Sequence, residues 1–265
     1  MFKVNPGQCP HQGRSAKYTL PGAGDVSRRP NRVRHRGEWM ATLEEMFDVA
    51  GKSVIVTGGA SGIGRAYAEV MADNGARVCI FDINPVTLDQ IVTELSAKGA
   101  DVWGQIVDVS DRPAMATGFD VVAQKHGQID VVFANAGLDP GPGFMHADGN
   151  RNPDLAIENI SDVQWDRGIE LNLTSVYVTV KNAVRHVKPA GGGRIIVTSS
   201  IAAMINESIV GTSYMPAKAG VGHFVRRMAM ELGAYGILIN SINPGPFMTN
   251  IAGGLRDYRR HHLSR

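Results

Sequence analysis

Short apolar runs alternate with longer amphipathic stretches along the chain from residue 52 onward. The runs are rich in Val and Ile at successive positions, which is typical of strands buried on both faces of a sheet. The predicted strands cover residues 53–57, 77–81, 102–107, 129–134, 194–198 and 237–242. The predicted helices cover residues 62–74, 85–98, 111–126, 161–187 and 213–234. Because strands and helices alternate, we expect a doubly wound α/β fold with helices on both sides of a parallel sheet.

The stretch over residues 161–187 shows the helical pattern most clearly. Ser161 suits the N-cap, and Pro189, followed by three glycines, ends the pattern. Apolar side chains recur every three or four residues in one stripe, which predicts a single long helix packed on the sheet. The stripe consists of Trp165, Ile169, Leu173, Val176, Val180, Ala183 and Val187. A loop over residues 138–159, rich in Gly, Pro and Asp, precedes this helix and is longer than most such connections.

The two ends of the chain differ in composition from the part between them. Residues 1–39 hold eight Lys and Arg against two acidic residues, are rich in Gly and Pro and show no apolar period, so we expect a disordered basic extension. Residues 255–265 form a second basic segment, and the folded domain is expected over residues 40–254. The formal net charge of +2 arises from these ends, so it does not indicate a nucleic-acid partner for the acidic body.

Hydrophobic residues make up 43% of the chain, which excludes disorder of the whole chain. No apolar run reaches the length of about 18 residues that a membrane-spanning helix needs, so we expect a soluble protein. Cys9 and Cys79 give neither a disulfide framework nor a metal-binding spacing, which favours a reducing compartment and no metal. The pair Arg28 and Arg29 is not followed by the apolar segment of an export signal, so we expect a cytoplasmic location.

A glycine-rich turn joins the first predicted strand to the first predicted helix. Gly58, Gly62 and Gly64 have the spacing G-x-x-x-G-x-G, and Ser61 and Ile63 lie between them. Glycines allow a tight turn and bring backbone N–H groups close to a phosphate at the start of the helix. Because the turn lies between a strand and a helix, it predicts a dinucleotide site.

Asp82 ends the second predicted strand, eighteen residues after Gly64. A carboxylate at this place accepts hydrogen bonds from the ribose hydroxyls of an adenosine and repels a 2′-phosphate. The alternative is an aspartate that serves only the turn after the strand. With the glycine turn beside it, we expect NAD as the cofactor and NADP as the less favoured one.

Five further motifs follow the glycine turn along the chain. They are Asn135-Ala136-Gly137, Asn172, Ser200, Tyr214 with Lys218 four residues later, and Asn243-Pro244-Gly245. With the glycine turn they resemble the short-chain dehydrogenase/reductase family of single-domain oxidoreductases, over about residues 51–250. One departure is Ala134, which stands where the family usually has a second Asn. The resemblance implies a Rossmann-like, three-layer α/β/α fold, a small-molecule alcohol or ketone substrate, and NAD-dependent chemistry at a CH–OH group.

Hydride transfer between a nicotinamide and a carbonyl carbon needs a group that gives or takes a proton at the oxygen. Tyr has an unperturbed pKa of about 10. Lys218 lies one helical turn after Tyr214, where its ammonium is expected to favour the phenolate. The resemblance implies that Tyr214 is the acid and base and that Lys218 also binds the nicotinamide ribose. It implies further that Ser200 orients the substrate oxygen and that Asn172 anchors a water of the proton relay.

The resemblance also assigns cofactor contacts outside the glycine turn. Asp108 and Val109 resemble the pair that contacts the adenine. Pro244, Gly245 and Thr249 resemble the segment that closes over the nicotinamide. The remaining contacts that it implies are Asn135, Ala136, Gly137, Tyr214 and Lys218.

Each motif has a structural alternative, since a Tyr and a Lys four residues apart are common on amphipathic helices. A non-catalytic nucleotide-binding scaffold, or an inactive truncated relative, is therefore the second functional hypothesis. A sugar-nucleotide epimerase or dehydratase is disfavoured by the glycine spacing. Only sixteen residues follow Thr249, without an apolar run, whereas the family continues through a helical lid to a last strand. We therefore expect the sheet to lack its last strand, and the family's homotetramer or dimer to lose much of its contact surface.

Overall fold

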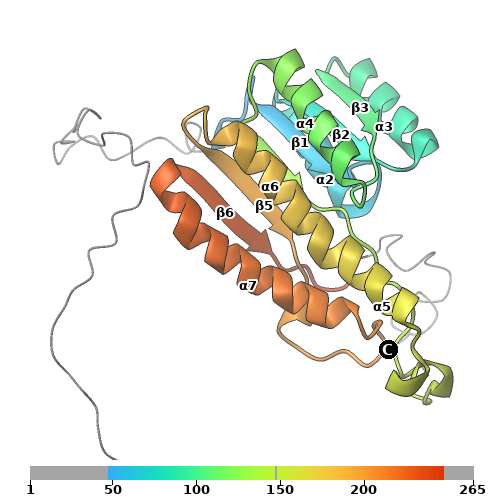
Figure 1. Ribbon diagram of the computed structural model, residues 1–265. Helices are drawn as coiled ribbons and strands as arrows, with labels where there is room; N and C mark the ends of the chain where they lie inside the picture. The colour runs from blue at the N-terminus through green and yellow to red at the C-terminus, as the bar shows by residue number, and fades with distance from the viewer. Residues whose placement is uncertain (1–46, 147, 248–265) are drawn as a thin grey trace, which may run out of the picture. The chain divides into compact units, whose positions relative to one another are not determined.

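The computed structural model describes residues 47–146 and 148–247. The predicted extension over residues 1–39 and the predicted tail over 255–265 lie outside these residues. The described residues contain a six-stranded parallel sheet in the order β3-β2-β1-β4-β5-β6, with the helices packed against it (Figure 1). The strands are β1 Ser53–Thr57, β2 Arg77–Asp82, β3 Val102–Ile106, β4 Val131–Ala134, β5 Gly193–Thr198 and β6 Ile237–Ile242. The predicted doubly wound α/β class is confirmed.

The helices divide between the two faces of the sheet. The helices that follow β1 and β2 pack on one face, and the helix after β3 and the α-helices on either side of β5 in the sequence pack on the opposite face. The α-helices are α2 Gly62–Asp73, α3 Pro85–Ala97, α4 Arg112–His126, α5 Asp162–Ile169, α6 Ser175–Val187 and α7 Tyr214–Leu232. Shorter turns of 3-10 helix are η2 Pro153–Leu155, η3 Ile157–Asn159, η5 Ile201–Ala203 and η6 Gly233–Tyr235. No helix within the described ranges is both long and apolar enough to cross a membrane.

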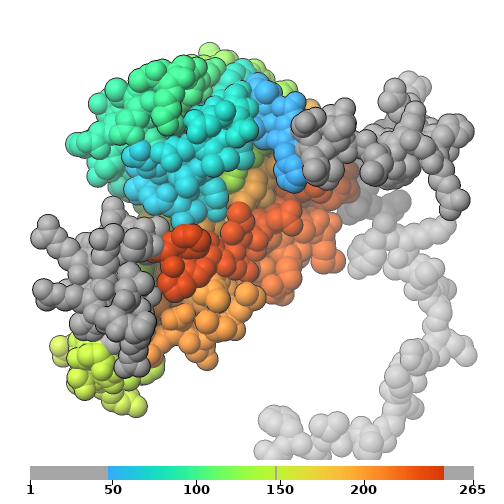
Figure 2. Space-filling model, turned by 180° about the vertical axis from the view of Figure 1, so that it is seen from behind, coloured from blue at the N-terminus to red at the C-terminus, as the bar shows by residue number. Residues whose placement is uncertain are grey.

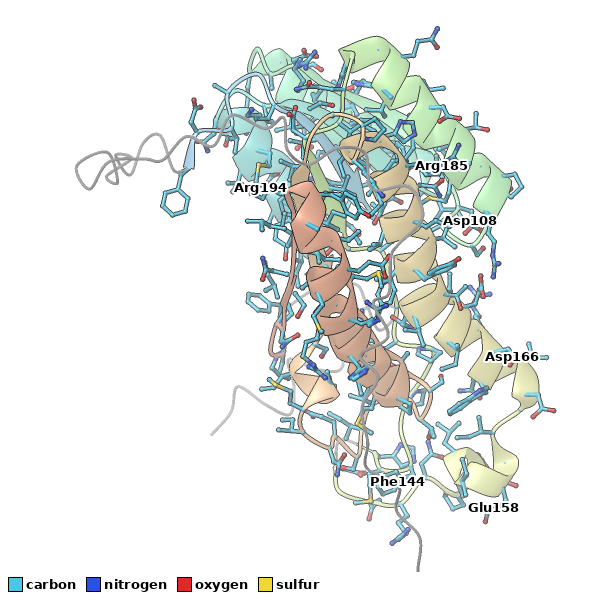
Figure 3. All side chains as sticks on the ribbon, turned by 60° about the vertical axis from the view of Figure 1, so that its left-hand side comes forward. Asp108, Phe144, Glu158, Asp166, Arg185 and Arg194 are labelled. Carbon is cyan, nitrogen blue, oxygen red and sulfur yellow. The ribbon has the colours of Figure 1, made fainter. Side chains whose placement is uncertain are left out.

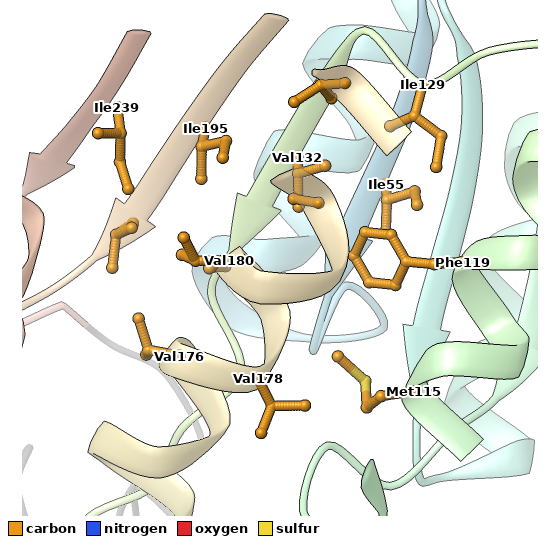
Figure 4. Packing of buried hydrophobic residues seen from close by; sticks show 14 of the residues in the cluster. Ile55, Met115, Phe119, Ile129, Val132, Val176, Val178, Val180, Ile195 and Ile239 are labelled. Atoms are coloured by element: carbon orange, nitrogen blue, oxygen red, sulfur yellow. The ribbon is translucent and has the colours of Figure 1, made fainter. Parts of the chain in front are cut away.

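In β1, β2, β4 and β5, alternate residues enter different hydrophobic cores, whereas in β6 only Ile237 and Ile239 enter a core. In β1, Ile55 packs toward α4 and α6, whereas Val54 and Val56 pack toward α2 and α3. Figure 4 shows Phe119 of α4 in the first of these cores, close to Ile55 and Val132. Burial on both faces explains why the strands are apolar at successive positions rather than at every second one.

Side chains cap several of the helices as their sequences suggest. Asn84 accepts hydrogen bonds from two backbone N–H groups at the start of α3, and Asp111 accepts one at the start of α4. Ser161 accepts from the N–H of Gln164 at 3.2 Å, as predicted. These caps satisfy donors that have no partner within the helix.

The predicted single helix over residues 161–187 is wrong in one respect, because a turn of π-helix, η4 Glu170–Thr174, separates α5 from α6. The side-chain Nδ2 of Asn172 donates to the carbonyl of Gly168 at 3.0 Å, at the place where the regular helical ladder would need that carbonyl. Trp165, predicted to belong to the apolar stripe, is 38% exposed on α5.

The loop before α5 and the end of the sheet complete the fold. Figure 3 shows Arg194 near the amino end of β5, and Phe144 and Glu158 beyond the opposite ends of the strands.

Among the described residues, β6 pairs with β5 and has no neighbour on its other side. Figure 2 shows the opposite face from that of Figure 1, with red and orange atoms of β6 and the following segment at the surface. Any further strand would lie outside the residues that the structure describes.

Candidate active site

A cavity of about 700 Å³ lies at the carboxyl ends of the central strands. Its walls include the turn after β1, the ends of β2, β4 and β5, and the start of α7. This is next to the switch point between β1 and β4, where doubly wound folds bind their ligands. The predicted site residues that line it are Gly58, Ser61, Gly62, Ile63, Asp82, Asp108, Val109, Asn135, Ala136, Gly137, Ser200, Tyr214, Lys218, Pro244 and Gly245. Thr249 lies outside the described residues.

The glycines of the turn after β1 are required by close packing. Gly58 has a φ of +63°, and a Cβ atom on it would lie 2.9 Å from the Cα of Ala136. A Cβ atom on Gly64 would overlap the carbonyl oxygen of Gly58. Gly64 therefore supports the turn from behind and does not itself line the cavity.

The start of α2 has the features of a phosphate site. Its N-cap, Ser61, makes no side-chain capping hydrogen bond, and the first turn carries no acidic residue. The backbone N–H groups there lack the side-chain partners found in α3, α4 and α5, and they lie at the positive end of the helix dipole. Since Ser61, Gly62 and Ile63 line the cavity, this end of α2 fits the pyrophosphate of a dinucleotide.

Asp82 and Asp108 mark the cavity at the ends of β2 and β3. The carboxylate of Asp82 accepts from the backbone N–H of Ala60 and of Asn84, both at 3.0 Å, which fixes its orientation. The Oδ1 atom of Asp108 accepts from the N–H and the hydroxyl of Ser110, at 2.9 and 2.7 Å. Both carboxylates are held by local contacts and both line the cavity.

Asn135 connects three strands at the bottom of the cavity. Its Nδ2 donates to the carbonyl oxygens of Thr57 and Gly58, at 3.1 and 3.3 Å. Its Oδ1 accepts from the hydroxyl of Thr198 at 3.0 Å. Asn135 therefore binds the ends of β1 and β5 to β4, next to the glycine turn.

Tyr214 and Lys218 lie together at the start of α7. Tyr214 is the first residue of this helix, and Lys218 follows one turn later, so both side chains line the cavity. The Nζ atom of Lys218 donates to the carbonyl of Thr198 at 3.0 Å and lies 5.4 Å from the centroid of the Tyr214 ring. Pro216 is accommodated because it occupies the first turn of α7.

Burial changes the acid–base properties of this pair. It raises the pKa of Tyr214, while the nearby Ser200 hydroxyl lowers it and the carboxylate of Asp139 adds a further rise. The pKa of Tyr214 is therefore raised, whereas the sequence pattern predicted that the ammonium of Lys218 would lower it. The Nζ atom of Lys218 donates to the carbonyl of Thr198 instead. Burial lowers the pKa of Lys218 itself to about 8.

Ser200 and Asn172 have different positions relative to the cavity. Ser200 lines it, and its hydroxyl oxygen accepts from the N–H of Ala202 at 3.1 Å. Asn172 is fully buried in the π-helical turn and does not line the cavity. Its side chain exchanges two hydrogen bonds with the backbone of Leu138, donating at 2.7 Å and accepting at 3.2 Å. It thereby fixes the chain immediately after Gly137.

Several residues that the sequence prediction did not single out also line the cavity. Asp139 comes two residues after Gly137, in the long loop, and Arg167 and Glu170 precede Asn172. The signal that could have found Asp139 is its place directly after the Asn-Ala-Gly motif at the end of β4. Others that line the cavity are Leu171, Ile201, Ala202, Glu207, Ile209 and Val210.

Known proteins are similar to this chain in both sequence and fold. One relative is the cis-4-hydroxycyclohexanecarboxylate dehydrogenase of Sinomonas cyclohexanicum, 34% identical over 206 residues that cover 78% of this chain and 77% of the relative. Another is the 3-oxoacyl-[acyl-carrier-protein] reductase FabG of Chlamydia pneumoniae, 33% identical over 79% of both chains.

A solved structure agrees with these relatives. It is a 7α-hydroxysteroid dehydrogenase complexed with NADH and 7-oxo glycochenodeoxycholic acid, with a TM-score of 0.70, 29% identity, and coverage of 80% of this chain and 76% of that one. The family model for short chain dehydrogenases matches residues 52–260, which include every strand of the sheet and the whole cavity wall. With this match and relatives above 30% identity, the chain belongs to the short-chain dehydrogenase family of nucleotide-binding oxidoreductases.

Proposed function

We propose that this protein is an NAD-dependent oxidoreductase that interconverts a secondary alcohol and a ketone. The observation that carries the proposal is that the glycine turn and the start of α2 line the same cavity as Ser200, Tyr214 and Lys218. A dinucleotide bound along the turn would supply the hydride acceptor or donor. The other groups of the cavity then have to bind the substrate oxygen and move its proton.

The cofactor would be held by groups at both ends of the cavity. Ser61, Gly62 and Ile63 offer backbone N–H groups to the pyrophosphate. Asp82 accepts from the adenosine ribose, and its charge disfavours a 2′-phosphate, so NAD is preferred over NADP. Asp108 and Val109 contact the adenine, while Asn135 to Gly137, Lys218, Pro244 and Gly245 surround the nicotinamide part.

Tyr214 acts as the acid and base at the substrate oxygen. The raised pKa of its phenol keeps the proton available near neutral pH, which suits donation to a carbonyl oxygen during reduction. Ser200 holds that oxygen by a hydrogen bond. Lys218 supplies positive charge near the phenol and the ribose, and Asn172 positions the backbone of Leu138 beside them.

The proposal is tested with the Tyr214→Phe variant. We expect it to bind NADH as the unmodified protein does, measured by NADH fluorescence, and to lose turnover of a panel of alcohols and ketones. Tyr235→Phe is the matched control, because Tyr235 packs against Lys188 and does not line the cavity. Turnover retained by Tyr214→Phe would refute the role of Tyr214. NADH binding without turnover of any substrate by the unmodified protein would favour the non-catalytic scaffold instead.

A further inference from the structure

Asp139 lines the cavity, close enough to the proposed acid and base for its charge to raise the pKa of Tyr214. It lines the cavity together with Ser200 and Tyr214. Its Oδ1 accepts from the N–H groups of Gly211 and Gly141, at 3.1 and 3.3 Å. Among the described residues, the Oδ2 atom of Asp139 accepts no hydrogen bond. This oxygen is also not fully buried, so a ligand in the cavity can reach it. One oxygen is therefore anchored to the protein and the other remains free for a ligand.

The anchoring connects Asp139 to the start of α7. Gly211 donates its N–H to Asp139, and its carbonyl accepts from the N–H of Tyr214 at 3.0 Å. A Cβ atom on Gly211 would lie 2.7 Å from the Oδ1 of Asp139, so the contact depends on a glycine. The orientation of the Asp139 carboxyl group is thus fixed relative to the backbone of Tyr214.

The loop that carries Asp139 is hydrogen-bonded to the loop that carries Gly211. Gly143 donates its N–H to Ile209 at 2.9 Å, and Met145 donates to Ser208 at 3.1 Å. A Cβ atom on Gly143 would overlap the backbone of the second loop, so the loops approach as closely as glycine allows. Asp139 is therefore part of a wall with defined geometry, which a specificity residue requires.

The rest of this wall indicates what Asp139 would contact. Besides apolar side chains, the wall carries the carboxylates of Glu170 and Glu207. The cations that line the cavity within the described residues are Arg167 and Lys218, and the latter already serves the Tyr214 side. A carboxylate oxygen can accept a hydrogen bond but cannot donate one. The free oxygen of Asp139 therefore selects a donor.

We propose that Asp139 is a specificity-determining residue that accepts a hydrogen bond from a second hydroxyl group of the substrate. The inference rests on the proposed function and adds the substrate class: ketones with a further hydroxyl, or the corresponding diols. A substrate with an ether oxygen in the place of that hydroxyl leaves the partly buried Asp139 acceptor without a partner, which lowers the rate with that substrate.

The experiment compares hydroxyl and methoxy substituents on one ketone. The unmodified protein is assayed with NADH and with cyclohexanones that carry a hydroxyl or a methoxy group at position 2, 3 or 4. We expect kcat/KM to favour the hydroxyl compound by about tenfold or more at one or more ring positions. In Asp139→Asn the side-chain amide can donate to the ether, so the ratio should fall to about one. Asp154→Asn makes the same change at an exposed site outside the cavity and should keep the original ratio.

Each outcome decides the matter. A ratio near one at every ring position in the unmodified protein overturns the inference, and so does a high ratio that Asp139→Asn leaves unchanged. If Asp139→Asn no longer binds NADH, the ratio of kcat/KM between hydroxyl and methoxy compounds is measured in Asp139→Ser instead and compared with the ratio of the unmodified protein. Turnover of these cyclohexanones with no preference for the hydroxyl compounds leaves the proposed function standing and removes only the inference. Absence of turnover with every ketone overturns both.

Discussion

Replacing Lys218 with Met tests how strongly the buried ammonium group opposes folding. Lys218 is 2% exposed, and burial lowers its pKa from 10.5 to about 8. In the unfolded chain this lysine regains its ordinary pKa. Between these two values the unfolded chain binds more protons than the folded chain, so the free energy of unfolding rises with pH. The rise is about 3 kcal/mol across the window, because each pKa unit corresponds to about 1.4 kcal/mol.

The assay is urea denaturation followed by circular dichroism at pH 7.5 and at pH 10.5, on the unmodified protein and on Lys218→Met. The difference in the free energy of unfolding between the two proteins removes the contribution of all groups that titrate in both. We expect the unmodified protein to gain about 3 kcal/mol relative to the variant at the higher pH. Lys98→Met is the control, since Lys98 is exposed at the end of α3, and it should show no such gain.

Two results would refute this reasoning. One is a difference between the proteins that stays constant with pH. The other is a relative loss of stability by the unmodified protein as the pH rises, which is the behaviour of a lysine whose charge is stabilised by a partner. In the first case the hydrogen bond from Lys218 to Thr198 would offset the burial of the charge, and in the second it would outweigh it.

Two further predictions concern the cofactor site. Gly64→Ala should abolish NADH binding, measured by fluorescence titration, because its Cβ would overlap the Gly58 carbonyl; Gly222→Ala, whose Cβ would meet nothing closer than 3.8 Å, should bind NADH normally. Asp82→Asn should lower the preference for NADH over NADPH roughly tenfold in dissociation constant, because it removes a charge that repels the 2′-phosphate. The exposed Asp89→Asn should leave that preference unchanged, and an unchanged preference in Asp82→Asn would show that other groups exclude the phosphate.

Features encoded by neighbours in the sequence were predicted well. The turn around Gly62 follows from glycine spacing between a strand and a helix, and the pair Tyr214 and Lys218 follows from one turn of helix. Both depend on a few adjacent residues, so no knowledge of distant contacts is needed. The strand positions were predicted for the same reason, because burial on both faces leaves a continuous apolar run.

Features that depend on distant contacts were not predicted. The break in the helix at Asn172 arises because its side chain reaches Leu138, 34 residues earlier. The position of Asp139 depends on Gly211, 72 residues later, and nothing in the local sequence indicates that contact. The raised pKa of Tyr214 likewise depends on burial by several segments, which the spacing to Lys218 does not report.

The π-helical turn between α5 and α6 has a consequence for how the protein could change over evolution. One additional residue in a helix rotates everything before it by about 100°, so α5 and α6 direct different faces toward the rest of the molecule. The apolar face of α6 packs on the sheet, while Arg167 of α5 and Glu170 of the turn line the cavity. Deleting a single residue here would restore a regular helix, but it would turn Arg167 away from the cavity. Substitutions in α5 can therefore alter the cavity wall while the packing of α6 on the sheet stays the same.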